Sequence, residues 1–334
     1  MSHFGGVKVF KINGFPWAAR KHGKRYQNLY TNFVPGWREL MRWRFGLGPA
    51  EPTPVISDSV FRPQISEPDF ALIHSPAPDA ITVTWIGHST FLLQTGGMNF
   101  LTDPIFSKHC SPIPLKRLAR RTQPGLTLQQ LPHIDAVLLS HSHYDHLDKA
   151  TLRQINAPIF CPEGVGALLN RLNISQTHEL TWGERAELAN SVELFCLPAQ
   201  HGSARTAFDR NHTLWCSWLL NHRNRKVFFT GDSGYAPFFA GFGEMFGPVD
   251  LALIPIAAYR PRWFMEALHM NPEEAIKVHR DIRAKSSIAM HWGTFELADD
   301  PIGEPPILLE RAREMAGLAP EAFRLLQFGE TAIF

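Results

Sequence analysis

Cysteines are few in this sequence, and long apolar runs are missing from it. The cysteines show no paired spacing that would indicate a disulfide framework or a thiolate metal site, so we expect free buried thiols. No segment approaches the roughly 18 to 20 uninterrupted apolar residues of a membrane-spanning helix, and the first residues lack the apolar centre of a signal peptide. These absences favour a cytoplasmic protein. The four cysteines are Cys110, Cys161, Cys196 and Cys216.

Internal repeats, low-complexity segments and an appended nucleic-acid-binding module are also missing. Nucleic acid is therefore not an expected partner. The 334 residues are 44% hydrophobic and 19% charged, which is ordinary for a folded protein and does not favour disorder. A chain of this length can bury a full core.

Basic residues are concentrated near the N-terminus. Residues 1–50 hold nine Lys and Arg against the single acid Glu39, a net charge of +8, whereas the remaining 24 basic and 30 acidic residues give −6. This imbalance favours an anionic partner for the N-terminal segment. Residues 1–78 are rich in Pro, Gly, Arg and Trp and show little periodicity. We interpret them as an extension that packs on a folded domain of residues 79–334.

One segment of the extension does show helical periodicity. Trp37, Leu40 and Met41 fall on one face of a helix that would run to about Phe45 and carry several arginines. Two interpretations remain open. Either this basic helix lies at a membrane interface, or the extension packs across its own core with the arginines in solvent.

Three imidazoles and a carboxylate stand within six residues, from His141 to His146. The apolar run 134–139 directly precedes them and has the length and content of a buried strand. The polar residues would therefore lie on the loop at the carboxyl end of that strand, where α/β folds place their functional groups. Without a cation, these imidazoles would repel one another or stay half-satisfied. The segment therefore predicts a metal site.

Three later strand-like runs, 192–200, 226–231 and 286–290, each lead to a further potential ligand. These ligands are His201, Asp232 and His291. Because the three runs would end at a common edge, we expect their ligands to lie beside the histidine-rich loop.

The donor types suit two divalent ions held close together. His141 and His143 alternate along an extended segment and would point toward one ion. Asp232, with two oxygens, would bridge the two ions. The first site would be formed by His141, His143 and His201, and the second by Asp145, His146 and His291.

The remaining patterns predict an alternation of strands and helices. Alternating β-formers at 81–85 and 90–104, the latter around Gly96-Gly97, predict a strand and a hairpin. Asn271 and Pro272 predict an N-cap and the first residue of a helix that continues to about residue 284.

A C-terminal helix near 306–315 and a final strand near 323–334 complete the expected chain. Residues 105–133 form a loop-like insert. Its basic cluster, 116–121, has two open interpretations, a phosphate site or a solvated face.

The H-x-H-x-D-H motif from His141 to His146, with the later ligands, resembles that of the metallo-β-lactamase superfamily. Further segments resemble one branch of it, the N-acylphosphatidylethanolamine-hydrolysing phospholipases D. The resemblance covers most of the chain from about residue 25. The segments that carry it include 87–90, 101–106, 144–148, 231–235, 259–265, 271–275 and 291–295.

The resemblance implies an α/β fold of four layers, an αββα sandwich, with two zinc ions in a groove along one edge of the sheets. Iron or manganese are alternatives to zinc. It also implies a homodimer.

The implied reaction is phospholipase D-type hydrolysis of N-acylphosphatidylethanolamine to N-acylethanolamine and phosphatidic acid, by a hydroxide that bridges the metals. Asp145 and Asp232 would act in catalysis as well as in ligation. His269 matches a histidine near the substrate in this family, and His88 and Asp103 would fix the ligand loops.

A phospholipid or another amphipathic phosphodiester is the implied substrate. An apolar groove wall with cationic points would suit it, although these side chains suit a core as well. The predicted wall residues are Tyr259, Arg260, Arg262, Trp263 and Phe264.

Other functions fit the same metals. Hydrolysis of a lactone, a β-lactam or another phosphodiester is an alternative, because one fold serves many reactions. A di-iron redox protein is a more remote one, since such proteins on this fold typically carry Glu where this chain has His143. A non-catalytic lipid-binding role is disfavoured by the complete ligand set.

Overall fold

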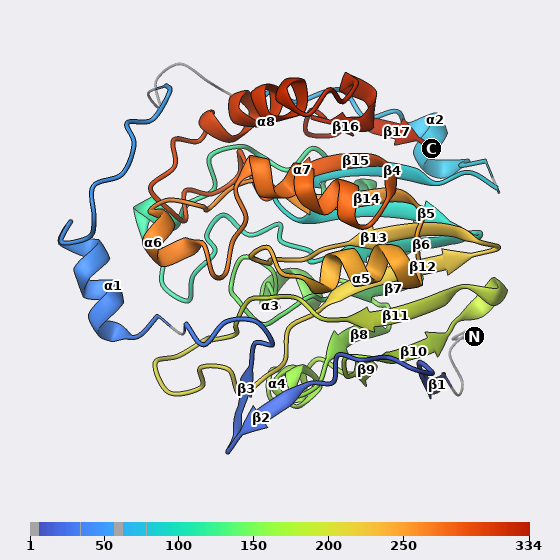
Figure 1. Cartoon of the computed structure of the whole chain (residues 1–334). Coiled ribbons are helices and arrows are strands. Elements are labelled where there is room, and N and C mark those ends of the chain that lie inside the picture. The colour runs from blue at the N-terminus through green and yellow to red at the C-terminus, as the bar shows by residue number, and fades with distance from the viewer. Residues whose placement is uncertain (1–6, 34, 57–62, 78) are drawn as a thin grey trace.

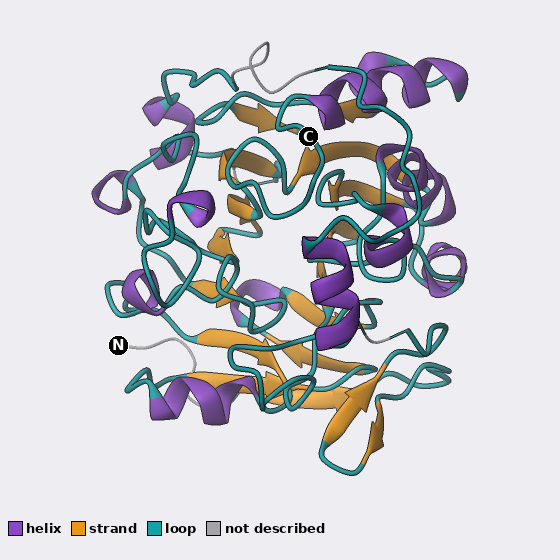
Figure 2. Ribbon diagram, turned by 90° about the vertical axis from the view of Figure 1, so that its left-hand side faces the viewer, coloured by secondary structure: helices purple, strands orange, loops and turns teal. Residues whose placement is uncertain are grey.

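The computed structural model describes residues 7–33, 35–56, 63–77 and 79–334. Within this part of the chain, the strands form an eight-stranded sheet, a seven-stranded sheet and a separate two-stranded hairpin of β2 (Arg20–His22) and β3 (Arg25–Gln27). The strands of the two sheets lie between the helices, and the hairpin projects from the lower edge (Figure 2).

The larger sheet is antiparallel on one side and parallel on the other. In order, its strands are β1 (Lys8–Lys11), β10 (Glu184–Glu187), β11 (Glu193–Leu197), β12 (Ser217–His222), β13 (Arg225–Phe229), β14 (Val249–Pro255), β15 (Ala284–Met290) and β16 (Phe323–Arg324). The smaller sheet runs through β17 (Thr331–Ile333), β4 (Thr82–Gly87), β5 (Thr90–Thr95), β6 (Met98–Thr102), β7 (Ala136–Leu138), β8 (Ile159–Pro162) and β9 (Thr177–Leu180).

Helices cover the outer face of each sheet (Figure 1). The helices of the described residues are α1 (Trp37–Arg44), α2 (Phe70–His74), α3 (Lys149–Leu152), α4 (Val165–Arg171), α5 (Phe238–Met245), α6 (Arg262–Met265), α7 (Pro272–Asp281) and α8 (Glu304–Met315), of which α1 lies away from the sheets. On the larger sheet, α7 packs against β14 and β15 and contacts both α5 and α8, whereas α4 packs against β8 and β9 of the smaller sheet. The predicted αββα sandwich is thus confirmed.

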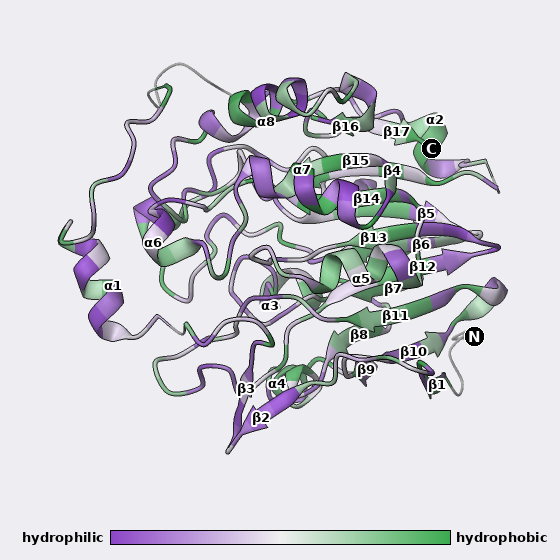
Figure 3. Ribbon diagram, in the orientation of Figure 1, coloured by the Kyte–Doolittle hydropathy of each residue, from purple (hydrophilic) through white to green (hydrophobic). Residues whose placement is uncertain are grey.

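The strand sequences explain the two cores. Phe91 and Leu93 of β5 contribute to the core between the sheets, whereas Leu92 contributes to the core beneath α4. Successive side chains of a strand point to opposite faces, so a strand that is covered on both faces is apolar throughout. The green central strands in Figure 3 follow this rule.

Helix α7 begins where the sequence predicts. The Asn271 side chain accepts a hydrogen bond from the Glu274 backbone N–H at 2.9 Å, and the Glu274 carboxylate accepts one from the Asn271 N–H at 2.9 Å. This reciprocal pair satisfies two donors that a helix N-terminus leaves free. The helix packs behind β15, which leads to His291.

The two ends of the chain differ from the sequence prediction. The segment thought to lack periodicity supplies β1, which pairs antiparallel with β10. The single strand expected near 323–334 is two short strands, because β16 joins the larger sheet and β17 the smaller one. The predicted boundary at residue 78 lies outside the described residues.

The basic cluster of the 105–133 insert is divided between different contacts. The guanidinium of Arg120 donates to the backbone oxygens of Ile105 and Ser107. Arg121 forms an ion pair with Glu296. These two arginines therefore do not converge on one anion site.

Helix α1 stands apart from the sheets, at the same end of the molecule as α6 (Figure 1). Its Glu39 carboxylate accepts a hydrogen bond from the Gly36 N–H at 2.8 Å, and none of its residues is buried. Trp37 is 72% exposed and Phe45, just beyond the helix, is 69% exposed. None of the helices in the described part of the chain combines the length and apolarity needed to cross a bilayer.

Candidate metal centre

The predicted ligands meet at one end of the two sheets. The loop after β7 carries the histidine-rich motif, and the segments after β11, β13 and β15 supply His201, Asp232 and His291. Gly231, before Asp232, has a φ of +62°, and a Cβ there would lie 2.7 Å from the Ser140 Cβ. Only glycine fits this approach, so it helps to bring two ligand segments together.

The first group of donors consists of three ring nitrogens that face one point. His143 Nδ1 lies 2.8 Å from His141 Nε2 and 3.1 Å from His201 Nε2. His141 and His201 are buried and His143 is partly buried. This is the trio predicted to share one ion.

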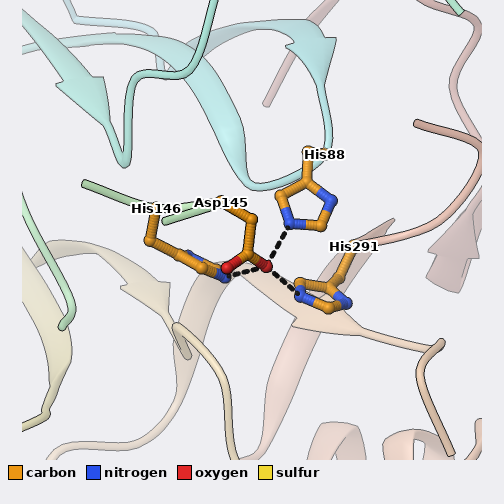
Figure 4. Close-up of side chains that lie close together, drawn as sticks. All are labelled: His88, Asp145, His146 and His291. Atoms are coloured by element: carbon orange, nitrogen blue, oxygen red, sulfur yellow. Dashed lines mark hydrogen bonds and ion pairs between the residues drawn. The ribbon is translucent and has the colours of Figure 1, made fainter. Parts of the chain in front are cut away.

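The second group surrounds a carboxylate oxygen of Asp145 (Figure 4). Asp145 Oδ2 lies 3.3 Å from His146 Nε2 and 3.5 Å from His291 Nε2. The same oxygen lies 3.0 Å from His88 Nε2. Asp145, His146 and His291, the second predicted trio, therefore lie together, with His88 beside them.

Asp232 stands between the two groups. Its Oδ2 lies 3.1 Å from His291 Nε2 and 3.2 Å from His146 Nε2. It lies 3.7 Å from His201 Nε2 and 4.0 Å from His141 Nε2. One oxygen therefore faces imidazoles of both trios, which is the position that a bridging ligand requires.

Burial and neighbouring charges set the protonation of these donors. Burial lowers the pKa of His143 to about 3 and that of His141 well below its ordinary value, and the nearby imidazoles act in the same direction. Burial disfavours the charge of Asp232, but His146 and His291 outweigh it and hold this pKa well below its usual range. Neutral imidazoles and ionised carboxylates are the forms that bind divalent metals. The neighbouring carboxylates, Asp232 above all, outweigh burial at His146 and His291 and raise the pKa of both imidazoles, so a cation would displace a proton from each of these two.

The residues fit divalent metal ions. Three imidazole nitrogens that point at one another cannot all be satisfied by hydrogen bonds among themselves. Among the described residues, Asp232 Oδ1 is buried with no hydrogen-bond partner, and His146 Nε2 and His291 Nε2 are within ion-pair distance of carboxylate oxygens but form no hydrogen bond of good geometry. Unpaired buried polar atoms are costly, and cations coordinated by this donor set would satisfy them.

Asp103 and His88 lie behind the donors, as a supporting role requires. Asp103 Oδ2 is 2.7 Å from His146 Nδ1, and its Oδ1 accepts a hydrogen bond from the Ser140 N–H at 2.7 Å. His88, Asp103 and His291 all have positive φ values. Strained backbone of this kind collects at functional sites, where surrounding contacts hold it in place.

Two supporting residues escaped the sequence analysis. The Asn28 side chain pairs with the backbone of His201, donating to its carbonyl at 2.7 Å and accepting from its N–H at 3.0 Å. Arg205 Nη1 donates to the carbonyls of Ser142 and Leu147 at 2.9 Å each, and its guanidinium lies 3.8 Å from the Tyr144 ring centroid. Arg205 therefore ties together the two ends of the loop that carries three predicted ligands.

Removing this tie is expected to loosen the loop. We predict that Arg205→Ala weakens metal binding by about 10- to 100-fold, the usual effect of losing a group that orients ligands. Arg205→Lys keeps a donor and should recover part of the affinity. Competition against a chromophoric chelator and the absorption spectrum of the cobalt-loaded protein measure this. Arg171→Ala, an exposed arginine of α4, is the control, and unchanged affinity in Arg205→Ala would contradict the role.

A cavity of about 350 Å³ reaches His143 and His201. Its apolar wall consists of Phe33, Trp37, Leu40, Phe264 and Leu268, and its polar wall includes Asn28, Thr206, Arg210 and Asn211. The N-terminal extension and the domain therefore build the cavity together.

His269 lies against the predicted ligands. Its ring centroid is 4.9 Å from that of His201 and 5.7 Å from that of His291. Its Nδ1 is buried and has no hydrogen-bond partner among the described residues. Burial lowers the pKa of His269 well below its ordinary value, and the charge repulsion of a protonated His201 would add to this.

The residues predicted to form a groove wall have more varied positions. The Tyr259 hydroxyl donates to Glu304 at 2.7 Å, and Arg260 forms an ion pair with the same carboxylate at 2.8 Å. Both side chains are buried, and the cavity wall does not include them. A buried acid distant in sequence binds both polar groups, and their place in a substrate groove stays a prediction.

Helix α6 instead holds the N-terminal extension. Phe264 lines the cavity and packs against the Trp43 ring at 4.8 Å between centroids. The Arg42 guanidinium lies 5.2 Å from the Trp263 ring centroid. Arg262 forms an ion pair with Glu274 at 3.0 Å and donates to the His269 carbonyl at 3.1 Å. One short helix thus fixes both α1 and the His269 segment.

Comparison with known proteins agrees with this geometry. Residues 98–292 match the model of the beta-lactamase superfamily domain. An uncharacterized protein of Mycobacterium tuberculosis is 40% identical over 285 residues, which cover 83% of this chain and 72% of that protein. The N-acyl-phosphatidylethanolamine-hydrolyzing phospholipase D 1 of Caenorhabditis elegans is 39% identical over 241 residues, which cover 68% of this chain and 66% of that protein.

Among solved structures, a metallo hydrolase of the archaeon Ignicoccus hospitalis is similar, with a TM-score of 0.59 and 24% identity over 76% of this chain and 98% of that one. This likeness concerns the fold alone. The family match, the fold and the clustered donors lead to one conclusion. The chain belongs to the beta-lactamase superfamily, as a metal-dependent hydrolase of the branch related to the N-acyl-phosphatidylethanolamine-hydrolysing phospholipases D.

Proposed function

We propose that the protein is a dinuclear zinc phosphodiesterase of phospholipase D type, with N-acylphosphatidylethanolamine as its substrate. The reaction would place the oxygen of water on phosphorus and release N-acylethanolamine and phosphatidic acid. The activity of the Caenorhabditis elegans relative supports this choice of substrate.

One observation carries the proposal, the cavity that joins ligand imidazoles to an apolar wall. His143 and His201 line it together with Phe264, Leu268 and Trp37. Acyl chains favour burial against such side chains, since each buried methylene contributes about 0.8 kcal/mol. A phosphodiester with acyl chains would therefore present its polar part to the imidazoles and its chains to the wall.

The predicted ligands would hold two zinc ions, His141, His143 and His201 at one and Asp145, His146 and His291 at the other. Bound zinc supplies a hydroxide nucleophile at neutral pH and polarises a phosphoryl oxygen. Asp232, whose Oδ2 faces both trios, would fix their separation.

Asp145 and His269 would position the reacting groups. His88 Nε2 lies 3.0 Å from Asp145 Oδ2 and so restrains the carboxylate that would orient the attacking water. The lowered pKa of His269 keeps its imidazole neutral, with one ring N–H to donate. We propose that this N–H donates a hydrogen bond to the oxygen that leaves phosphorus.

The substrate lies in a bilayer, so the protein would bind a lipid surface through α1. Trp37 and Leu40 of this helix line the cavity and are also exposed, and Arg38 and Arg42 lie beside them. Aromatic and basic side chains on one short helix favour the interface of an anionic membrane.

The direct test is turnover of N-acylphosphatidylethanolamine in vesicles by the zinc-loaded protein, with both products measured by mass spectrometry. We expect metal-dependent release of N-acylethanolamine. Phe45→Ser, at the exposed end of α1 and outside the cavity, should raise KM on vesicles but leave turnover of a soluble short-chain diester unchanged.

Chromogenic lactone and β-lactam substrates serve as the comparison. If the protein releases no more N-acylethanolamine than buffer does, the proposed lipid substrate is wrong, and the protein is a metal-dependent hydrolase of another substrate.

A further inference from the structure

The guanidinium of Arg210 has no partner in the part of the chain that the structure describes. Arg210 lines the same cavity as His143 and His201. Its side chain is half-buried, and no carboxylate of the described residues forms an ion pair or hydrogen bond with it. A partly buried charge without a counter-charge is unfavourable, so its retention in a cavity wall calls for an explanation.

The backbone on both sides of Arg210 is fixed. Asp209 Oδ1 accepts hydrogen bonds from the N–H groups of Arg205 and Thr206 at 3.0 and 2.8 Å, which closes a turn. On the other side, Asn211 is buried and its Oδ1 accepts from the Ser203 N–H at 3.0 Å. The backbone that carries Arg210 is therefore fixed beside the cavity that its side chain lines.

The surrounding charges favour an incoming anion. Burial lowers the pKa of Arg210, and the nearby Arg25 lowers it further by repulsion. Glu39 is the acid that acts on Arg210 from a distance, and its carboxylate is already bonded to the Gly36 N–H at the start of α1. Arg25 and Arg210 lie on this side of the cavity, and the carboxylates near them, Glu39 and Asp209, are already bonded to backbone N–H groups.

We propose that Arg210 is the specificity residue of this cavity, and that it binds a phosphate or carboxylate group of an amphipathic substrate. The inference rests on the proposed function, since it assigns a role within the same cavity. The apolar wall would take the chain of the substrate and Arg210 its negative group, by paired N–H···O bonds. A neutral amphiphile of equal chain length would then bind less tightly.

Binding of non-hydrolysable probes to the zinc-loaded protein tests this separately from turnover. The probes are dodecyl phosphate, dodecanoate and the neutral monododecanoylglycerol, each below its micelle concentration and measured by calorimetry. We expect Arg210→Gln to weaken the binding of at least one anionic probe by about 10- to 100-fold. The affinity for the neutral probe should stay within about twofold of that of the unchanged protein. Arg210→Lys should keep part of the preference.

Two controls accompany the measurement. Arg311→Gln removes an exposed charge of α8, outside the cavity, and should change nothing. The two anionic probes show whether phosphate or carboxylate is preferred. Equal losses for anionic and neutral probes, or no loss in Arg210→Gln, would overturn the inference even if the protein hydrolyses the phospholipid. Selective loss of anionic-probe binding in Arg210→Gln, in a protein that does not hydrolyse the phospholipid, would support the role of Arg210 in anion binding and reject the proposed substrate.

Discussion

Asp232→Asn is expected to lower kcat by about 10³-fold, the upper range for losing one charged group at a reacting centre. Asp232 Oδ2 lies 3.1 Å from His291 Nε2 and 3.7 Å from His201 Nε2, so this one oxygen is close to imidazoles of both trios. Asparagine replaces an anionic oxygen with an amide and cannot bridge two cations in the same way. Turnover together with metal analysis of the purified variant measures the effect.

Asp79→Asn is the matched control for this variant. The Asp79 carboxylate is highly exposed and, among the residues that the structure describes, pairs only with Arg223 at 3.5 Å, so the same chemical change should leave kcat intact. If Asp232→Asn keeps near-normal turnover with its metal bound, the bridging role is wrong.

Metal removal is expected to lower the melting temperature by about 5 to 10 °C. Bound cations would satisfy Asp232 Oδ1, which is buried without a hydrogen-bond partner among the described residues, and would be coordinated by His146 Nε2 and His291 Nε2. A ligand at 1,000 times its Kd stabilises the native state by about 4 kcal/mol, which corresponds to this shift in a chain of this size. Calorimetry before and after treatment with a zinc chelator gives the value.

Adding zinc back should restore the original melting temperature, and a chelator already saturated with zinc should have no effect. Metal content is followed in the same samples. Identical melting in the loaded and the demonstrably metal-free protein would contradict a structural contribution of the ions.

Local patterns predicted the framework of the site. Residues 134–139 read as a buried strand, and the structure places β7 (Ala136–Leu138) there, directly before the donor loop. The start of helix α7 at Asn271 could also be predicted, because the residues that form its capping contacts lie within four positions of one another. Such signals depend on residues that are neighbours in the sequence, so they can be recognised without knowledge of the tertiary structure.

Contacts between distant segments gave no such signal. All four residues of β1 are exposed, so the strand lacks the alternation that would mark it. Asn28 binds the backbone of His201, 173 residues away, and nothing in its own surroundings indicates this. A side chain that binds backbone atoms can have any residue type as its partner, so the sequence contains no complementary residue that would indicate the contact.

The same limit applies to the arginines. Arg260 and Arg210 are both arginines in loop-rich segments, and either suits an anion site by sequence. Glu304 neutralises Arg260 in the structure, whereas Arg210 has no acid partner among the described residues. The sequence could not rank them, because the ion pair joins residues 44 positions apart.

The sequence by itself determined the donor types and the strand ends that carry them, since these follow from local periodicity and from a compact motif at His141 to His146. The fold class was implied by the resemblance of that motif and of the further segments to a known family. Only the tertiary structure decided which oxygen lies between the two trios, which residues support them and which cation is left for a ligand. Those properties depend on distances between segments and on burial, and both arise only when the sheets and the N-terminal extension pack together.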